Sequence, residues 1–366
     1  MDLHMVPGIT AQGVAEAHVL DLKVQKEFQC SCMTYWIDEN NESAFCLIEA
    51  PNENAVRELH KRSHGLLPYN IIEVNKNAVA SFLGRLYDPE IPGLLQEELK
   101  VFNDPARRTL VLIDIVDPIL LKNRVSTNMF EELCNRYSEI IQVQSAKFDG
   151  EIAEHVEQFT SIICFSTTEN ALSFALAITK SFTKQEKEHL SLKISLNSGM
   201  PVSSSEKIFG DTIELGEQLL FAYRDHKVVV ATNIKEIAYR HLNNGEEAKI
   251  FSLSPAEEKL LNKIFRVLEQ NSPDENFGID DFCREAGLSK SSLNRYTQGL
   301  TSRSPNSLLK EFRMIKALKF LKEGENISNV AFSTGFRSPS YFSKCFKEHF
   351  FLSPSDYVDQ IRSRAI

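Results

Sequence analysis

The feature that most constrains the fold is a helix-turn-helix pattern that occurs twice in the C-terminal part of the chain. In the clearer copy, a short amphipathic helix beginning at Ile327 ends at Gly335, and a second helix begins at Pro339. Glycine adopts the left-handed conformation that commonly ends a helix, and proline suits the first helical turn because its missing N–H is not needed there. Phe342 and Phe346 lie one helical turn apart, so both are predicted to pack inward. Five side chains then face outward, as on a helix that enters a DNA major groove: Ser338, Ser340, Tyr341, Lys344 and Lys347.

A weaker copy of the same pattern precedes this one. A helix over 279–288 leads into a second helix that Ser289 caps, and Leu293 and Tyr296 are predicted to face the core. The outward positions of this second helix are polar or basic: Lys290, Ser291, Asn294 and Arg295. Between the two copies, 307–321 keeps a helical period, with apolar residues at 308, 309, 312, 315, 318 and 321. This helix is expected to hold the two copies at a fixed separation.

The whole arrangement resembles the C-terminal DNA-binding domain of the AraC/XylS family of transcription regulators. The resemblance covers roughly 260–358 and rests on the linking helix, on the run Gly-Phe-Arg-Ser-Pro-Ser-Tyr-Phe over 335–342, and on Ser353-Pro354. The sequence departs from the family at Ser302 and Phe351, which stand where a turn glycine is usual. Those two turns are therefore expected to be longer or strained, because the left-handed region disfavours residues with a side chain.

The resemblance implies that double-stranded DNA is the partner, with the two recognition helices in successive major grooves about 34 Å apart. The candidate base readers are Asn294, Arg295, Arg337, Ser340 and Tyr341. The candidate phosphate anchors are Lys290, Lys344 and Lys347. Ser291 and Ser338 complete the expected DNA-binding set.

Charge is distributed in a way that agrees with this expectation. The chain has a net charge of −9, but from Leu288 to the end there are 13 Lys and Arg residues against 6 Asp and Glu residues, or +7. A locally basic segment on an acidic body is typical of a module that binds phosphates. DNA is therefore expected to dock on the C-terminal segment and to be repelled by the rest.

Length and composition favour a multidomain α+β protein of the cytoplasm. Proline-punctuated stretches over 86–93 and 253–255 divide the 366 residues into predicted domains at 1–88, 105–252 and 260–366. No apolar run is long enough to span a bilayer, and no signal peptide or membrane partner is expected. The seven cysteines are scattered, which favours reduced thiols.

The first segment is predicted to be a ferredoxin-like βαββαβ domain. Its predicted strands are 1–6, 33–37, 44–48 and 69–74, and its predicted helices are 14–28 and 53–63. Four of the nine histidines of the chain fall here: His4, His18, His60 and His64. His60 and His64 share a helix face, Asp2 and His4 share a strand face, and His18 and Asp21 share a helix face. Imidazole and carboxylate together suit nickel, zinc or copper.

Residues 1–76 also resemble a family of small ferredoxin-like bacterial proteins described as nickel-binding. The matching pieces are Asp2-Leu3-His4, the segment 17–21 with Gln25, the segments 45–51 and 60–65, and Ile71-Ile72-Glu73-Val74. The resemblance implies a site for Ni²⁺ or another divalent transition metal. Its candidate ligands are His4, His18, His60 and His64, with Asp2, Asp21 and Glu73 as further candidates. An alternative is a dimerisation domain whose histidines lie at the interface.

The middle segment resembles the class III nucleotide cyclase catalytic domain over roughly 107–240, so a cyclase-like α/β domain is predicted. The most specific pieces are the buried strand Leu112-Ile113-Asp114-Ile115-Val116 and the run Phe209-Gly210-Asp211-Thr212. Asp114 matches the first metal-holding aspartate of that family. The second position is occupied by Gln158-Phe159, and Glu214 and Gln218 replace the Asn and Arg that steady the transition state. We therefore expect no enzymatic activity and no catalytic residue here, and Asp114 and Asp211 also suit ordinary strand-end and turn positions.

These observations favour a sequence-specific transcription regulator that is a homodimer and responds to a transition metal or another small-molecule effector. Metal binding would change DNA affinity only through a different affinity for two states of the protein. Two other hypotheses stay open: a nucleotide cyclase with a DNA-binding tail, and a metal-buffering protein with a vestigial tail. A metal-buffering protein would bind metal but show no salt-dependent DNA binding. A cyclase would form cyclic nucleotides from ATP or GTP.

Overall fold

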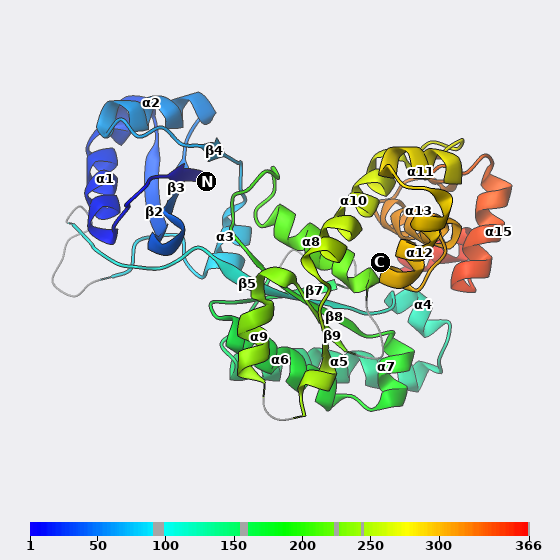
Figure 1. Ribbon diagram of the computed structural model, residues 1–366. Helices are drawn as coiled ribbons and strands as arrows, with labels where there is room; N and C mark the ends of the chain where they lie inside the picture. Colours follow the sequence, from blue (N-terminus) through cyan, green and yellow to red (C-terminus); the bar gives the residue numbers. More distant parts are fainter. Residues whose placement is uncertain (91–98, 154–159, 223–226, 243–244, 365–366) are drawn as a thin grey trace.

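The computed structural model describes residues 1–90, 99–153, 160–222, 227–242 and 245–364. It has mixed helical and sheet regions at its N-terminal end and in its middle, and a wholly helical C-terminal region (Figure 1). None of the helices in the described part of the chain combines the length and hydropathy that a membrane-spanning segment needs.

The N-terminal region forms a four-stranded antiparallel sheet in the order β2-β3-β1-β4. Its elements are β1 (Asp2–Met5), α1 (Ala11–Val24), β2 (Ser31–Asp38), β3 (Ser43–Glu49), α2 (Glu53–Ser63) and β4 (Asn70–Ile71). The helix predicted over 53–63 has those bounds, and Asn52 caps it through the N–H of Ala55. A further helix, α3 (Lys76–Leu83), was not predicted.

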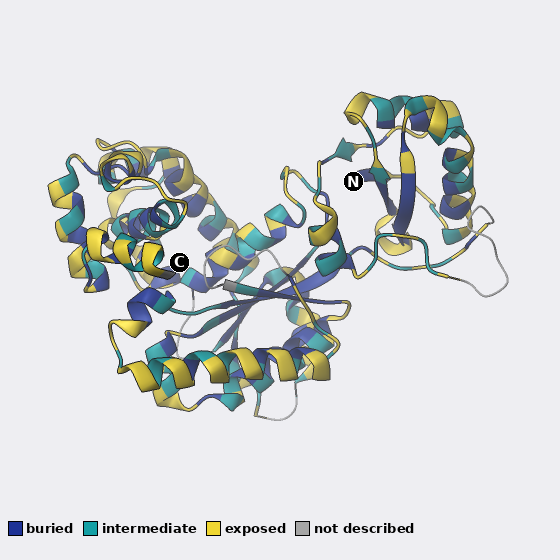
Figure 2. Ribbon diagram, turned by 180° about the vertical axis from the view of Figure 1, so that it is seen from behind, coloured by how far each residue is buried: buried dark blue, intermediate teal, exposed yellow. Residues whose placement is uncertain are grey.

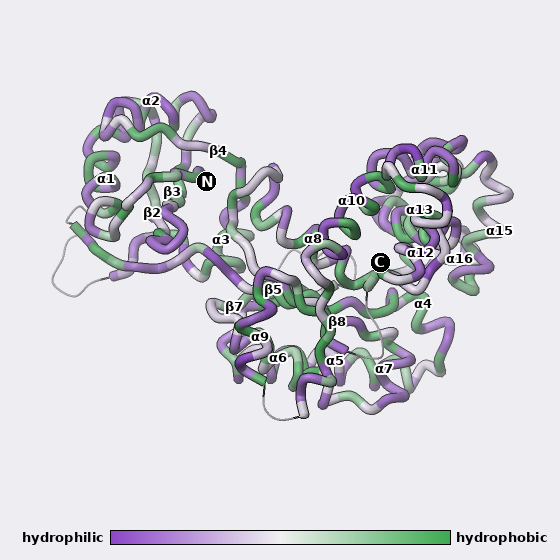
Figure 3. Tube along the Cα trace, in the orientation of Figure 1, coloured by the Kyte–Doolittle hydropathy of each residue, from purple (hydrophilic) through white to green (hydrophobic). Residues whose placement is uncertain are grey.

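The two faces of this sheet have different partners. On one face, Tyr35, Ile37 and Cys46 pack with Val14 and Ala15 of α1. The opposite face packs in one apolar cluster with α3 and with the middle sheet. Figure 3 shows the strands of the middle sheet largely in the green of hydrophobic residues. The members of this cluster include Leu3, Trp36, Phe45, Val79, Phe82, Leu110, Leu112 and Phe209. The N-terminal region is therefore joined to the middle region by a shared core.

The middle region is a six-stranded mixed sheet in the order β10-β9-β8-β5-β7-β6. Its strands are β5 (Arg108–Asp114), β6 (Glu151–Ile152), β7 (Thr160–Phe165), β8 (Lys193–Gly199), β9 (Val228–Val230) and β10 (Ile250–Phe251). β5 pairs antiparallel with β7 and β8, and β8, β9 and β10 run parallel. The helices are α4 (Pro118–Lys122), α5 (Thr127–Lys147), α6 (Thr168–Ser181), α7 (Lys184–Leu190), α8 (Gly210–Phe221) and α9 (Lys235–His241). Figure 2 shows the strands buried and the outer helices exposed on one side.

Within the described residues the C-terminal region consists of seven helices, one of which, α13, is the linking helix predicted from the sequence. They are α10 (Pro255–Asn271), α11 (Ile279–Ala286), α12 (Lys290–Thr301), α13 (Pro305–Lys322), α14 (Ile327–Ser333), α15 (Pro339–Phe350) and α16 (Pro354–Arg364). Leu308, Leu309 and Leu321 of α13 are buried as predicted. Ile315, expected to be part of the same apolar stripe, is 42% exposed. The stripe instead runs through Met314 and Ala317, because both sides of α13 pack against helices.

The C-terminal helices rest on the middle region at two places. α10 contributes Leu261, Ile264 and Leu268 to the same core as the middle sheet and the first helix-turn-helix unit, α11 and α12. α4 inserts Ile119 and Leu120 into the core of the second unit, α14 and α15. Both helix-turn-helix units therefore pack against the middle region.

Candidate metal centre and DNA-binding surface

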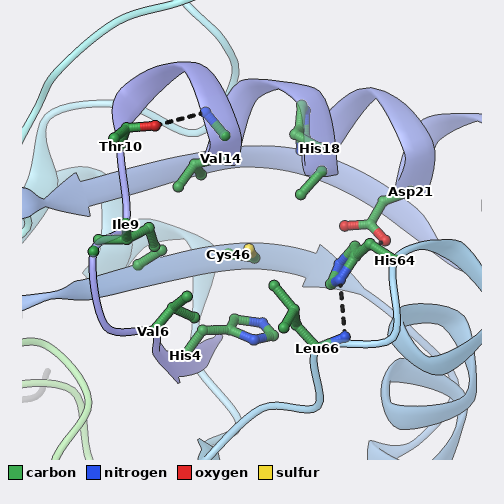
Figure 4. A pocket seen from close by; sticks show the side chains of 14 residues that line it. His4, Val6, Ile9, Thr10, Val14, His18, Asp21, Cys46, His64 and Leu66 are labelled. Atoms are coloured by element: carbon green, nitrogen blue, oxygen red, sulfur yellow. Dashed lines mark hydrogen bonds and ion pairs between the residues drawn. The ribbon is translucent and has the colours of Figure 1, made fainter.

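The N-terminal region gathers imidazole, carboxylate and thiol groups from four elements at one end of its sheet. Asp2 and His4 alternate on β1, and antiparallel pairing places Cys46 of β3 opposite Asp2. α2 brings His60 and His64 to the same place, and α1 brings Asp21. Two overlapping groups have ligand atoms within 4.8 Å of one another, Asp2–His4–Cys46–His60 and Asp21–His60–His64. Figure 4 shows several of these side chains converging from β1, β3, α1 and the end of α2.

His60 is the centre of the cluster. Its Nε2 donates a hydrogen bond to Oδ2 of Asp2 at 2.8 Å, and its Nδ1 lies 3.2 Å from Oδ1 of Asp21. The Nε2 atom of His64 lies 3.0 Å from Nδ1 of His60. Ser63 donates to the same oxygen of Asp21, and the N–H of Cys46 donates to Asp2. Each carboxylate is therefore held in a fixed orientation toward the imidazoles.

Burial and hydrogen bonding act in opposite directions on these groups. Desolvation opposes the charged form of His60, but hydrogen bonds to Asp2 and Asp21 outweigh it and raise the pKa of His60 to about 10. The pKa of Asp2 is lowered well below its usual value, because its interactions with the imidazoles of His4 and His60 outweigh its burial. The pKa of Asp21 is lowered in the same way by His60 and His64. Burial, followed by the charges of Asp2 and Asp21, raises the pKa of Cys46.

The donor set fits a divalent transition metal. Three imidazoles, two carboxylates and a thiol are the ligand types that nickel, zinc and copper accept. The Nε2 atom of His4 is buried without a hydrogen-bond partner in the described part of the chain, 3.6 Å from Oδ1 of Asp2, and is available as a ligand. Metal binding here requires loss of the second proton of His60, because imidazole ligates as the neutral ring.

Two residues of the predicted metal set lie apart from these groups. His18 faces Asp88, with 3.3 Å between Nε2 and Oδ2, and its ring lies against Tyr35. Glu73 is exposed and belongs to neither ligand group. Cys46 and Asp88 were not predicted. Cys46 depends on long-range strand register, and Asp88 follows the unpredicted helix α3, so the local sequence carries no signal for either.

The two recognition helices present polar surfaces of similar design. On α12, Lys290, Ser291, Asn294 and Arg295 are exposed, while Leu293 is buried. On α15, Ser340, Tyr341, Lys344 and Lys347 are exposed, Ser338 is half-buried at the N-cap, and Phe342 and Phe346 are fully buried. Arg337, just before α15, is exposed and contacts Asn276 at 3.4 Å. All ten predicted DNA-binding residues therefore lie at or beside the N-terminal parts and outer faces of these two helices.

The turns between and after these helices use the left-handed conformation. Gly335, between α14 and α15, has φ +77°, and a side chain there would collide with the carbonyl of Ser272. Ser302 ends α12 with φ 59° and Phe351 ends α15 with φ 61°. Both turns therefore adopt the left-handed backbone conformation that usually requires glycine, although neither residue is glycine. Of the two expectations for these turns, greater length or strain, the structure agrees with strain.

The nucleotide-cyclase positions of the middle region engage in internal contacts. Asp114, at the end of β5, forms an ion pair with Lys193 at 3.4 Å between Oδ2 and Nζ. On α8, Gln218 donates to Glu214 at 3.0 Å, and Asp211 accepts hydrogen bonds from Ser204. Gln158 and Phe159, which occupy the second aspartate position, lie outside the described residues. The resemblance of this region to cyclases stays a prediction.

Two family models match this chain, one at each end. A model described as "Helix-turn-helix domain" matches residues 282–360, and a model described as "Nickel responsive protein SCO4226-like" matches residues 1–74. The C-terminal region is an AraC-type helix-turn-helix domain. The N-terminal region is similar to the SCO4226-like family. Both resemblances predicted from the sequence are thereby confirmed at the level of these two regions.

Two relatives of this chain match it over only part of their own length. Histidine kinase P4 of Formosa agariphila is 36% identical over 110 residues, which are 30% of this chain and 8% of that protein. The HTH-type transcriptional activator RhaR of Mannheimia succiniciproducens is 32% identical over 107 residues, 29% of this chain and 37% of that protein. The chain thus spans well under half the length of either relative. A transcriptional regulator from Chromobacterium violaceum with an AraC-type domain superimposes with a TM-score of 0.27 at 23% identity, over 30% of this chain and 96% of that structure.

Proposed function

We propose that this protein is a DNA-binding transcription regulator whose affinity for DNA responds to a divalent transition metal, with Ni²⁺ as the first candidate. The AraC-type domain binds double-stranded DNA, and the SCO4226-like domain binds the metal. The observation that carries the proposal is the presence, on one continuously packed chain, of two exposed polar recognition helices and a buried imidazole–carboxylate cluster.

DNA binding is supported by the division of labour on the two recognition helices. Apolar side chains such as Leu293 and Phe346 anchor each helix, and its basic and amide side chains remain exposed. Arg295 and Arg337 suit guanine edges, and Asn294 suits adenine. Lys290, Lys344 and Lys347 suit phosphates, which position the protein without reading sequence.

Metal binding is supported by the chemistry of the cluster. His4, His60, His64, Asp2 and Asp21 are the proposed ligands, together with Cys46. When bound, a divalent cation supplies the positive charge that neutralises the two aspartates and ties β1, α1 and α2 together. His18 and Glu73 belong to the predicted set, but we place them outside this group, with His18 held by Asp88.

The remaining parts of the proposal concern the domains and the assembly. The antiparallel order β2-β3-β1-β4 with two helices on one face supports a ferredoxin-like assignment for 1–88. A non-catalytic cyclase-like module over 105–252 would couple the sensor to the DNA-binding domain over 260–366. The ion pair of Asp114 with Lys193 supports a structural role for that aspartate. We also propose a homodimer that acts in the cytoplasm.

The DNA-binding half of the proposal is tested by fluorescence anisotropy with a labelled fragment from upstream of this protein's own gene. Wild-type protein should bind it more tightly than a scrambled fragment, with affinity that falls steeply as salt increases. The double variant Arg295→Ala/Arg337→Ala should lose the preference for the specific fragment. Equal binding of both fragments by wild type, or an unchanged preference in the variant, would contradict the proposal.

The metal-binding half is tested by calorimetric titration of metal-free protein with Ni²⁺, Zn²⁺ and Cu²⁺. His60→Ala should weaken binding by at least about tenfold, because even supporting residues of metal sites contribute that much. His241→Ala, an exposed histidine on α9, is the matched control and should change nothing. Equal affinities of the two variants would show that the metal binds elsewhere. Activity assays with ATP and GTP serve as the check on the cyclase alternative, for which product formation would be decisive.

A further inference from the structure

A cavity of about 250 Å³ extends away from the histidine cluster into the N-terminal domain. It lies between the start of the chain, α1, β3 and the loop after α2, as Figure 4 shows. Most of its wall is apolar: Val6, Ile9, Val14, Ala17, Ala44 and Leu66. Leu66 is 46% exposed, so this wall reaches the surface of the protein.

One end of the cavity is polar and carries unused hydrogen-bonding capacity. The side chains of His4 and His18 line it and are 7% and 6% exposed. The Nε2 atom of His4 lies 3.6 Å from Oδ1 of Asp2 and that of His18 lies 3.3 Å from Oδ2 of Asp88, but neither contact has the geometry of a hydrogen bond within the described residues. A buried polar atom without a hydrogen bond destabilises the protein. A ligand atom that bonds to these nitrogens would offset that destabilisation.

A metal ion does not account for this space. The ligand groups converge at the ends of β1 and α2, whereas Ile9, Val14 and Ala17 line the part of the cavity along α1. A dry apolar cavity of about 150 Å³ is large enough for benzene. The present cavity is larger, so it suits a benzene ring with one or two small substituents.

Electrostatics limit the charge of the occupant. The polar end is surrounded by the carboxylates of Asp2, Asp21 and Asp88, with His60 as the cation between the first two. An anionic ligand would be repelled by the excess negative charge, and a cation would lose its hydration against the apolar wall. An uncharged molecule is neither repelled by the carboxylates nor forced to lose the hydration of a charge.

We propose that in the metal-free protein this cavity binds a small, uncharged, mostly apolar molecule about the size of a substituted benzene ring. Its hydroxyl or carbonyl group bonds to His18 and to the Nε2 atom of His4 that the metal would otherwise occupy. Such pockets, largely apolar with a few convergent polar groups, are the usual form of small-molecule sites. The inference deepens the proposed function by giving the regulator an organic effector site beside the metal ligands. The link between them is direct, since the N–H of Leu66 donates to Nδ1 of His64 at 3.2 Å.

The test uses metal-free full-length protein and phenol as the probe, with toluene and benzoate as comparisons. Saturation-transfer NMR should show that phenol binds at least tenfold more tightly than benzoate. Substitution His18→Phe should reduce the preference for phenol over toluene at least threefold. Ala17→Leu fills the cavity and should weaken phenol binding at least tenfold, whereas Ala17→Ser keeps the space and should retain it.

Several outcomes would overturn the inference: no phenol binding by wild type, equal binding of phenol and benzoate, or phenol binding that Ala17→Leu leaves unchanged. If Ala17→Leu does not fold, chemical shifts of Val14 and Ala44 in wild-type protein decide, because phenol must perturb them. These results depend on neither DNA nor metal. Failure of the regulator proposal would therefore appear in the anisotropy and calorimetry experiments. Failure of the cavity proposal would appear only in the phenol-binding experiments.

Discussion

The first helix-turn-helix unit, α11 and α12, and the second, α14 and α15, are built alike but are supported differently. In each, a serine caps the second helix, Ser289 or Ser338, and that helix ends in a left-handed residue that is not glycine. The core of the first unit is continuous with α10 and the middle sheet. The second unit has a separate core that α4 completes from outside.

The support of the second unit includes a buried polar anchor. Asp117 caps α4, accepts a hydrogen bond from Tyr357 at 2.6 Å and pairs with Lys322 at 2.9 Å. No comparable charged contact joins α11 or α12 to the middle region within the described residues. Local sequence therefore specifies the helix-turn-helix shape, whereas tertiary contacts decide how each unit is held. Of the two, the second unit depends on a contact that one substitution can break.

The largest loss of stability is expected when a large side chain is removed from the separate core of the second unit. Phe346 is fully buried and contacts the rings of Phe342, Phe350 and Tyr357. Phe346→Ala should lower the free energy of unfolding by about 3–5 kcal/mol, measured by chemical denaturation. Hydrogen exchange should rise in 327–360 and stay low in 279–301, and the exposed neighbour Lys347→Ala is the control. A uniform rise across both units would contradict the separation of their cores.

Breaking the anchor of the second unit should have the next largest effect. Asp117→Ala leaves Lys322 and Tyr357 without their carboxylate and uncaps α4, which should cost about 3 kcal/mol of stability. The loss should concentrate in hydrogen exchange of α4, α13 and α16. The nearby variant Asn123→Ala removes hydrogen bonds with the carbonyl of Ile119 and with Gln360 but keeps the carboxylate of Asp117, so it should cost less stability than Asp117→Ala. If Asp117→Ala leaves α16 as protected as in wild type, the anchor does not hold the second unit.

Much of this comparison could be predicted from the sequence, because caps and turns are local. Gly335, Pro339 and the spacing of Phe342 and Phe346 predicted the second unit, and the structure agrees with them. The docking of α4 could not be predicted, since Asp117 and Tyr357 are 240 positions apart and neither stands in a motif. Ile315 belonged to the expected apolar stripe but is exposed, because a helical period does not distinguish a helix buried on one side from one buried on two.

The candidate metal site shows the same limit. Asp2, His4, His60 and His64 were predicted by spacing and resemblance, and each pair lies on one element. Cys46 entered only through the register of β1 with β3. His18 was expected beside Asp21, but the fold gives it Asp88 instead.

Phosphate contacts by the two recognition helices should differ. Lys290 already pairs with Asp280 at 2.5 Å, whereas Lys344 forms no ion pair within the described residues. Lys344→Gln should reduce the slope of log affinity against log salt by about 0.9, the value for one phosphate contact. Lys290→Gln should reduce it less, because its charge is partly neutralised by Asp280. Equal slopes for the two variants in anisotropy titrations would remove this distinction.

The smallest effects are expected at the left-handed ends of α12 and α15. Ser302→Gly relieves a backbone strain and should stabilise the protein by up to about 1 kcal/mol, after the added freedom of glycine in the unfolded chain is subtracted. Phe351→Gly should gain less, because Arg124 lies over the Phe351 ring at 5.8 Å and that contact is lost. Melting curves of the two variants measure the difference. Greater stabilisation by Phe351→Gly would contradict the assigned contact.

The central claim is that the metal state of the N-terminal domain changes DNA binding by the C-terminal domain. The most direct measurement is fluorescence anisotropy with the upstream DNA fragment at fixed salt, with and without Ni²⁺, for wild type, His60→Ala/His64→Ala and the control His241→Ala. The account predicts that Ni²⁺ shifts the dissociation constant several-fold in wild type and in the control, and leaves the double variant unchanged. A shift of the same size in the double variant, or none in wild type, would contradict it.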